Sequence, residues 1–157
     1  MKIILMMVGK TDSTIYDRLI ADYAERLNKY LPFSTMILPD IRKTENMPPQ
    51  QRKEKEGELI LRALSPSDNL ILLDERGREH TSEEFAAYLG GRLNSGCKRL
   101  LFAIGGPFGF SEKVYAAASA RLSLSRMTFS HQMVRLIFVE QAYRAMTILR
   151  NEGYHHG

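Results

Sequence analysis

The sequence predicts an α/β fold in which helices flank a mainly parallel β-sheet. Strand-like and helix-like segments alternate along all 157 residues, which is typical of this class. The first strand-like segment, residues 2–8, is apolar almost throughout, as expected when helices cover both faces of a sheet. The length fits one domain, and no internal repeat or convincing linker divides the chain. We therefore expect a single domain over residues 1–157.

The N-terminal half predicts two strands and two helices. Large apolar residues recur every fourth position from Ile15 to Leu27, which indicates a helix with one wide apolar face that ends before Pro32. Further along, the run from Lys53 to Glu58 mixes both charges at helical spacing and indicates a salt-bridged face turned to solvent. The expected elements are a strand at 2–8, a helix at 14–30, a strand at 33–38 and, after a surface loop, a helix at 49–64.

The C-terminal half continues the alternation. Residues 75–77 favour a turn that ends the third strand. Thr81 and Glu84 have the spacing of a capping box at a helix start, and Ser111 and Ser130 are suitable N-caps for two later helices. The expected elements are strands at 69–74, 99–104 and 122–125, together with helices that begin after Thr81, run from Ser111 to Arg121 and run from Ser130 to Arg150.

The composition favours a cytoplasmic protein with a polyanionic partner. The single cysteine, Cys97, cannot form an intramolecular disulfide, and no apolar stretch approaches the roughly 20 residues needed to span a bilayer. The formal charge of +4 suits a nucleic acid, although a mildly basic solvated surface explains it equally well. The helix at 130–150 is apolar on most sides, so we expect a second subunit to cover part of it.

Two segments of the C-terminal half are candidates for a ligand site. Gly105 and Gly106 follow the fourth strand, where they place backbone N–H groups at the sheet edge that usually binds ligands in α/β folds. The alternative is a tight turn that requires positive φ. The segment GGPFG lacks the spacing of a dinucleotide fingerprint, and the chain has no phosphate-binding loop motif. A Rossmann dehydrogenase and a nucleotide triphosphatase are therefore both disfavoured.

The second segment is LSLSRMTFSHQMVR at residues 122–135. It places small hydroxyl residues, a methionine and an aromatic between two helical segments, so it could wrap around an amphipathic ligand. An ordinary strand-to-helix connection with Ser130 as N-cap explains the same residues. The physical chemistry of the residues leaves both interpretations open.

Taken in order, these motifs resemble those of the RlmH family. The matching segments are GGP and GFS within 105–111, LSLSRMT and HQMVR within 122–135, EQAYRA at 140–145, and the terminal NEGYHH at 151–156. Val8 and Gly9, KEKEG at 53–57, and the pair Leu73 and Asp74 agree as well, so the resemblance covers essentially the whole chain. One departure is Gly153, which stands where the family usually has proline; glycine loosens the tail.

The resemblance implies a SPOUT-class (α/β knot) methyltransferase whose C-terminal part forms a trefoil knot. It implies a homodimer that transfers a methyl group from S-adenosylmethionine to N3 of a pseudouridine in 23S ribosomal RNA, within the ribosome and without a metal ion. By motif, nine residues would bind the cofactor through apolar and backbone groups: Leu73, Gly105, Gly106, Leu124, Ser125, Arg126, Met127, Thr128 and Phe129.

By the same motifs, histidines and arginines would form the substrate side of the site. His131, His155 and His156 are candidates for the base that removes the imide proton, because a histidine pKa of about 6.5 lies near working pH. Arg135 lies one helical turn beyond His131 and could hold RNA phosphate or stabilise charge on the base, so it is a candidate catalytic residue too. The expected RNA-binding residues are Arg135, Arg144, Tyr154, His155 and His156.

Several of these assignments have alternatives. His131 could bond to backbone at the start of its helix, and Arg144 could form an intrahelical ion pair with Glu140, four residues earlier. His155 and His156 could belong to a disordered chain end. For the function as a whole, the alternatives are a SPOUT methyltransferase that acts on transfer RNA and a non-catalytic ribosome or RNA-binding module. A flavodoxin-like electron carrier is a more distant alternative.

Overall fold

The computed structural model describes residues 1–157 and contains one five-stranded sheet in the order β2-β1-β4-β3-β5, in which every neighbouring pair is parallel. The strands are β1 (Lys2–Val8), β2 (Phe33–Leu38), β3 (Asp68–Glu79), β4 (Arg99–Ile104) and β5 (Ala120–Ser123). The helices are α1 (Thr14–Asn28), α2 (Pro49–Ala63), α3 (Ser82–Asn94), α4 (Glu112–Ala117) and α5 (His131–Leu149). The predicted fold class, a parallel sheet flanked by helices, is confirmed.

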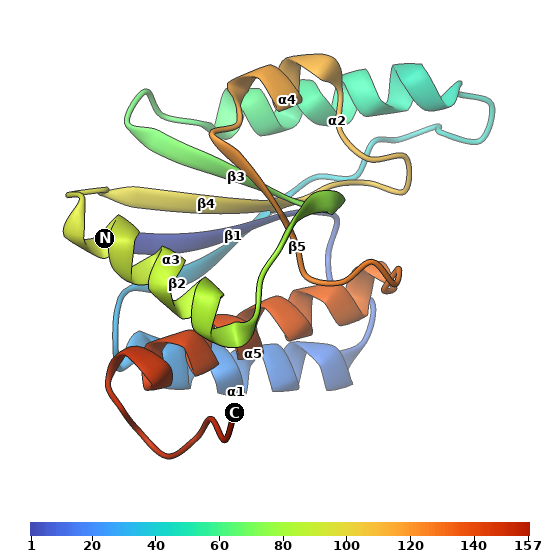
Figure 1. Cartoon of the computed structure of the whole chain (residues 1–157). Helices are drawn as coiled ribbons and strands as arrows, with labels where there is room; N and C mark the ends of the chain where they lie inside the picture. The colour runs from blue at the N-terminus through green and yellow to red at the C-terminus, as the bar shows by residue number, and fades with distance from the viewer.

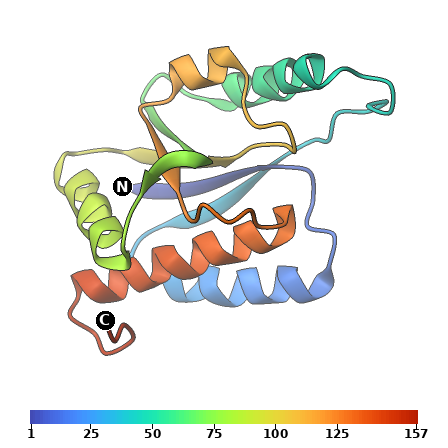
Figure 2. The same cartoon turned by 45° about the vertical axis from the view of Figure 1, so that its right-hand side comes forward.

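Helices cover both faces of the sheet. In Figures 1 and 2, α2 and α4 lie on one face, and α1, α3 and α5 lie on the other. Alternate residues of β1 serve the two layers: Ile3 and Leu5 pack in the cluster beneath α1, α3 and α5, while Ile4 and Met6 pack in the cluster beneath α2 and α4. This two-sided burial explains why the strand is apolar throughout.

The predicted helix starts are confirmed by their capping hydrogen bonds. Thr81 and Glu84 form the reciprocal capping box of α3. The Ser111 side chain accepts from Val114 N–H at the start of α4, and the Ser130 side chain accepts from Met133 N–H at the start of α5. None of the helices is both long and apolar enough to cross a membrane.

The boundary predicted at residues 75–77 is wrong, because β3 continues to Glu79. The turn-prone residues instead interrupt its pairing with β5, where Leu122 lies beside both Leu73 and Arg78. Gly77 is needed because the two chains pass closely: an added Cβ would lie 2.7 Å from backbone atoms of Arg121 and Leu122. Gly77 therefore does not mark a turn; it allows β3 to pass close to the backbone of β5, which lies more than 40 residues later in the sequence.

Two further expectations are corrected. The helix predicted from Ser111 to Arg121 ends at Ala117, and the next strand begins at Ala120, because the Ser119 N–H bonds to the Leu70 carbonyl of β3 at 2.8 Å. The charged face of α2 is not wholly turned to solvent. Glu56 and Gly57 are buried, since they share a helical face with the buried Ile60.

The apolar character of α5 is largely explained within one chain. This helix packs against α1, α3 and the sheet together, with Phe138 and Ala142 fully buried. Near its start, however, Met133 is 37% exposed, and the facing end of α1 exposes Ile15 (68%) and Leu19 (42%). An apolar surface around these three side chains is thus left uncovered.

Candidate functional site

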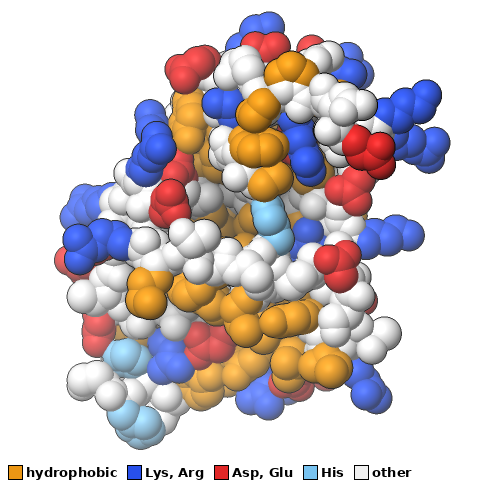
Figure 3. Space-filling model, turned by 90° about the vertical axis from the view of Figure 1, so that its right-hand side faces the viewer, with side chains coloured by type: hydrophobic (Ala, Val, Ile, Leu, Met, Phe, Trp, Pro, Cys, Tyr) orange, Lys and Arg blue, Asp and Glu red, His pale blue; other side chains and the backbone are white.

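The carboxyl ends of the central strands bring the predicted segments to one edge of the sheet. Ile104, the last residue of β4, pairs with Met7 of β1 and Leu73 of β3, and Leu73 also pairs with Leu122 of β5. Gly105 and the loop at residues 124–129 follow β4 and β5 directly, so both start at this edge. Figure 3 looks onto it and shows a hollow bordered by hydrophobic side chains, with charged side chains of both signs around the rim.

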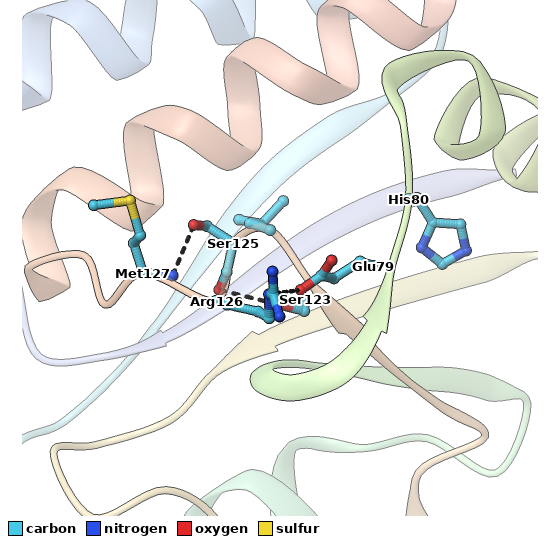
Figure 4. Close-up of a pocket in the computed structure, with 7 residues that line it drawn as sticks. Glu79, His80, Ser123, Ser125, Arg126 and Met127 are labelled. Atoms are coloured by element: carbon cyan, nitrogen blue, oxygen red, sulfur yellow. Dashed lines mark hydrogen bonds and ion pairs between the residues drawn. The ribbon is translucent and has the colours of Figure 1, made fainter.

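The loop after β5 forms an open depression of about 500 Å³, shown in Figure 4. It is lined by Glu79, His80, Ser123, Leu124, Ser125, Arg126 and Met127. Three interactions brace it: the Ser123 hydroxyl donates to the Ser125 carbonyl (3.0 Å), the Met127 N–H donates to the Ser125 hydroxyl (2.9 Å), and Arg126 pairs with Glu79 (3.0 Å). The size is within the usual range of small-molecule pockets, and hydroxyl, backbone and apolar groups face it together.

Four of the nine predicted cofactor residues line this depression, namely residues 124–127. The Thr128 hydroxyl donates to Glu75 (3.1 Å), and Phe129 is half-buried. Leu73, Gly105 and Gly106 lie outside the depression: Leu73 is in β3, and the two glycines directly follow β4. His80 and Glu79 line it without having been expected, because only the extension of β3 beyond residue 74 carries them there.

The two glycines after β4 are not explained by a turn with positive φ, which was one of the two interpretations of the sequence. Gly105 and Gly106 do not have positive φ; only Gly109 of this turn does, at +80°. A Cβ on Gly105 would lie 3.1 Å from the ring of Phe110, and a Cβ on Gly106 would overlap the carboxylate of Glu56. Close packing of protein side chains therefore favours glycine at both positions, more strongly at Gly106, where Glu56 would have to move.

Glu56 joins the site although the sequence placed it only within the charged run at 53–58, with no role assigned to it. Its carboxylate is 4% exposed and accepts a charge-assisted bond from Arg52 Nε at 3.1 Å, one turn earlier in α2. The guanidinium of Arg52 lies 5.8 Å from the ring centroid of Phe108, in the turn after β4. The i,i+4 spacing of Arg52 and Glu56 was visible in the sequence, but not the face of α2 that packs inward.

His131 is the first residue of α5 and lies at the same edge. It is half-buried, and its side chain makes no hydrogen bond, so the alternative of a backbone-bonded histidine does not hold. Burial lowers the pKa of His131 and the charge of Arg135 lowers it further, whereas Glu56 raises it. The lowered pKa favours the neutral imidazole, which is the form that can accept a proton.

Arg135 does not occupy the exposed position expected of an RNA-phosphate ligand. Its side chain is 2% exposed and donates to the Val8 carbonyl (3.0 Å) and the Thr11 hydroxyl (3.2 Å), while Nε has no partner. The residue thus ties the segment after β1 to α5. A bond from the Asp12 N–H to Gln132 (3.1 Å) reinforces this connection beside His131.

The C-terminal tail packs against α5 and α3 rather than extending away. Arg144 forms the intrahelical ion pair with Glu140 at 2.6 Å, and the Tyr154 hydroxyl donates to the same carboxylate at 3.0 Å. His155 lies 3.3 Å from Arg144 and 2.7 Å from Glu83 of α3, and its hydrogen bond is the main cause that lowers the pKa of Glu83 to about 2.

The structure does not bring this tail to His131 within one chain. Arg144 follows His131 by 13 positions in α5, which corresponds to about 20 Å along the helix. His156 is exposed, and a Cβ on Gly153 would meet nothing within 4 Å. The predicted substrate-side residues thus form two groups, one at each end of α5.

Comparisons with known proteins agree with this architecture. A family model described as "Predicted SPOUT methyltransferase" matches residues 1–155. Proteins named Ribosomal RNA large subunit methyltransferase H from Parabacteroides distasonis, Christiangramia forsetii and Bacteroides thetaiotaomicron are 57%, 54% and 53% identical over 156 residues, which is 99% of this chain and 99% of each relative. The chain therefore belongs to the SPOUT methyltransferases, in the RlmH family that its motifs indicated.

Proposed function

We propose that the chain transfers a methyl group from S-adenosylmethionine to N3 of a pseudouridine in 23S rRNA of the large ribosomal subunit. As a methyltransferase it uses a methyl-donor cofactor. The assignment of rRNA as the substrate is supported by similarity, over 99% of both chains, to relatives whose name states methylation of large-subunit ribosomal RNA. The pseudouridine and its N3 position rest on the family motifs. Such a substrate also supports a cytoplasmic location.

The residues at the carboxyl edge fit the cofactor. The depression formed by residues 123–127 offers backbone and hydroxyl groups for polar edges, and the side chains of Leu124 and Met127 offer apolar contact. Leu73 and Gly105 extend the binding surface along the sheet edge. Bound there, S-adenosylmethionine would supply an electrophilic methyl group on a sulfonium, which needs no metal ion.

His131 is the base that we assign to the imide proton. Its imidazole has a lowered pKa, makes no hydrogen bond and begins α5 at the edge where the predicted cofactor segments start. Arg135 is a positioning residue in this proposal, because its contacts hold residues 8–11 against α5. Proton removal and alignment of the acceptor nitrogen are the two tasks that methyl transfer to a ring nitrogen requires.

The pH dependence of the reaction tests this assignment. Because burial and Arg135 lower the pKa of His131, the acid limb of kcat/KM should have its midpoint below the ordinary value of about 6.5. His131→Gln should remove that limb and lower kcat by at least about 100-fold. Rates of methyl transfer to large subunits between pH 5 and 8, at roughly equal ionic strength, provide the measurement. An unchanged limb in the variant would assign the base elsewhere.

We also propose a homodimer in which the tail of one subunit completes the site of the other. Two observations support it: the uncovered apolar surface of Ile15, Leu19 and Met133, and the separation of about 20 Å between His131 and Arg144 in one chain. In this proposal residues 1–157 form one methyltransferase domain, with the C-terminal trefoil knot that the family implies, and Tyr154, His155 and His156 contact RNA.

Mixing two defective variants tests the shared site. Removal of residues 154–157 should lower turnover at least about tenfold, as for one lost contact of about 1.4 kcal/mol, without weakening cofactor binding. When equal amounts of the truncated variant and His131→Gln exchange subunits, about half of the dimers contain one subunit of each kind. Each mixed dimer holds one intact site out of two, so activity should return to about a quarter of wild type. No restoration after verified exchange of subunits would show that each chain uses its own tail.

Transfer of label from tritiated S-adenosylmethionine tests the function itself. Large subunits from cells that lack this protein should accept about one methyl group each, and mass spectrometry of the rRNA should place it on N3 of a pseudouridine. Label in transfer RNA but not in large subunits would favour the transfer-RNA alternative. A folded protein that binds no cofactor in calorimetry would favour the non-catalytic module.

A further inference from the structure

An exposed aromatic ring with an arginine beside it lies in the turn after β4. Phe108 is 47% exposed, although aromatic side chains usually contribute to stability through burial. The turn that carries it is firmly held, because the Gly109 N–H bonds to the Gly106 carbonyl at 3.1 Å and the two residues form an isolated β-bridge. The fold thus leaves nearly half of this aromatic residue exposed at the surface.

The cation beside the ring is held just as firmly. The guanidinium of Arg52 lies 5.8 Å from the Phe108 ring centroid and is anchored by Glu56, whose buried carboxylate touches the backbone at Gly106. The Arg52 side chain remains 29% exposed, so part of its planar donor edge faces solvent. An aromatic face and a guanidinium plane that are both preorganised form a surface on which a flat, electron-rich ring can stack.

The location connects this surface to the proposed active site. Gly106, which begins the turn, directly follows the predicted cofactor residue Gly105. The charges of Glu56 and Arg52 both act on His131, so the pair lies close to the base that we assign. A group stacked on Phe108 would therefore lie beside the reacting edge of the sheet.

The surrounding charge is suited to a nucleic acid. Five cations in the segments after β1 and β2 and in α2 take part in no ion pair: Lys10, Arg42, Lys43, Lys53 and Lys55. Figure 3 shows lysine and arginine side chains around the hollow, interspersed with aspartate and glutamate. Exposed cations and an exposed aromatic ring on the same nucleic-acid-binding protein suit single-stranded RNA, since phosphates can meet the cations while a base stacks on the ring.

We propose that the Phe108 ring and the Arg52 guanidinium, positioned by Glu56, form a stacking surface for an unpaired base of the RNA substrate next to His131. This inference rests on the proposed function, because it identifies how the same site holds its RNA. It assigns substrate binding to two residues that were not among those predicted to bind the cofactor or RNA.

The experiment compares Phe108→Ala and Phe108→Trp with a matched control, Leu149→Ala. Leu149 is also a partly exposed apolar residue, but it lies at the far end of α5. Steady-state methylation of large subunits from cells that lack the protein gives KM and kcat, calorimetry gives the affinity for S-adenosylmethionine, and thermal unfolding reports on folding. Phe108→Ala should raise KM for the subunits about tenfold or more, with cofactor affinity changed less than about twofold.

The other variants separate stacking from a general structural effect. Phe108→Trp should restore KM to within about twofold of wild type, because tryptophan also provides a stacking face. Arg52→Ala should raise KM about fivefold, while Leu149→Ala should leave it unchanged. If Phe108→Ala and Leu149→Ala had equal KM values, or if Phe108→Ala weakened cofactor binding as much as it raised KM, the stacking surface would be wrong. The proposed methyltransferase function would not be affected by either result. If the wild-type protein transfers no label to large subunits, the proposed function is wrong and the stacking surface fails with it.

Discussion

Replacing Gly77 with alanine should lower the free energy of unfolding by about 3 kcal/mol. The added Cβ would lie 2.7 Å from the backbone carbonyl carbons of Arg121 and Leu122 and from the Leu122 nitrogen. Backbone atoms cannot move aside as the end of a flexible side chain can, so β3 and β5 would have to separate where their pairing is already irregular. Urea unfolding followed by circular dichroism measures the change.

Gly91→Ala is the matched control for this prediction. Gly91 lies inside α3, and a Cβ there would meet no atom within 4 Å. Alanine at this position should raise stability by up to about 1 kcal/mol, because it restricts the unfolded chain and favours the helix. If Gly77→Ala proved as stable as the wild-type protein, β3 and β5 could not pass as closely as described.

Replacing Arg135 with methionine should lower kcat at least about tenfold and leave the salt dependence of RNA binding unchanged. Methionine keeps an apolar stem but cannot donate to the Val8 carbonyl or the Thr11 hydroxyl, so residues 8–11 lose their tie to α5 beside His131. Misplacement of reacting groups by as little as 1 Å can cost about 100-fold in rate. The loss of two hydrogen bonds is offset by the release of a buried guanidinium, so stability should change little.

The salt dependence distinguishes this positioning role from a direct phosphate contact. If Arg135 bound a phosphate, its removal would lower the slope of log affinity against log salt concentration by about one unit. Affinity for large subunits between 50 and 300 mM salt, measured for wild type, Arg135→Met and Arg135→Lys, reports the slope. Arg135→Lys should recover part of kcat, since lysine retains one donor. A reduced slope in Arg135→Met would restore the phosphate assignment.

The strands and helices could be predicted because their signals lie in residues that are close together in the sequence. The periodicity of α1, the continuous apolar run of β1 and the capping box at Thr81 each predicted their element within a few residues. Prediction was wrong where a distant segment decided the outcome. Residues 75–77 resemble a turn on their own, but pairing with β5 draws them into a longer β3.

The candidate site divides in the same way. Residues 124–127 were predicted from their motif and line the depression, but Glu79 and His80 join them only because β3 extends. Glu56 lay within a charged run that looked solvent-facing, since nothing local reveals which face of α2 meets the turn after β4. The tail appeared loose in sequence, yet Tyr154 and His155 bond to Glu140 and Glu83.

The sequence by itself determined the fold class and the family, and it predicted which segments form the cofactor site, because periodicity, caps and motifs are encoded in neighbouring residues. Only the tertiary structure decided what individual polar side chains do. Arg135 bonds to the carbonyl of Val8, 127 positions earlier, and His155 bonds to Glu83, 72 positions earlier. Contacts of such separation depend on how the whole sheet and its helices pack, and no local pattern contains that information.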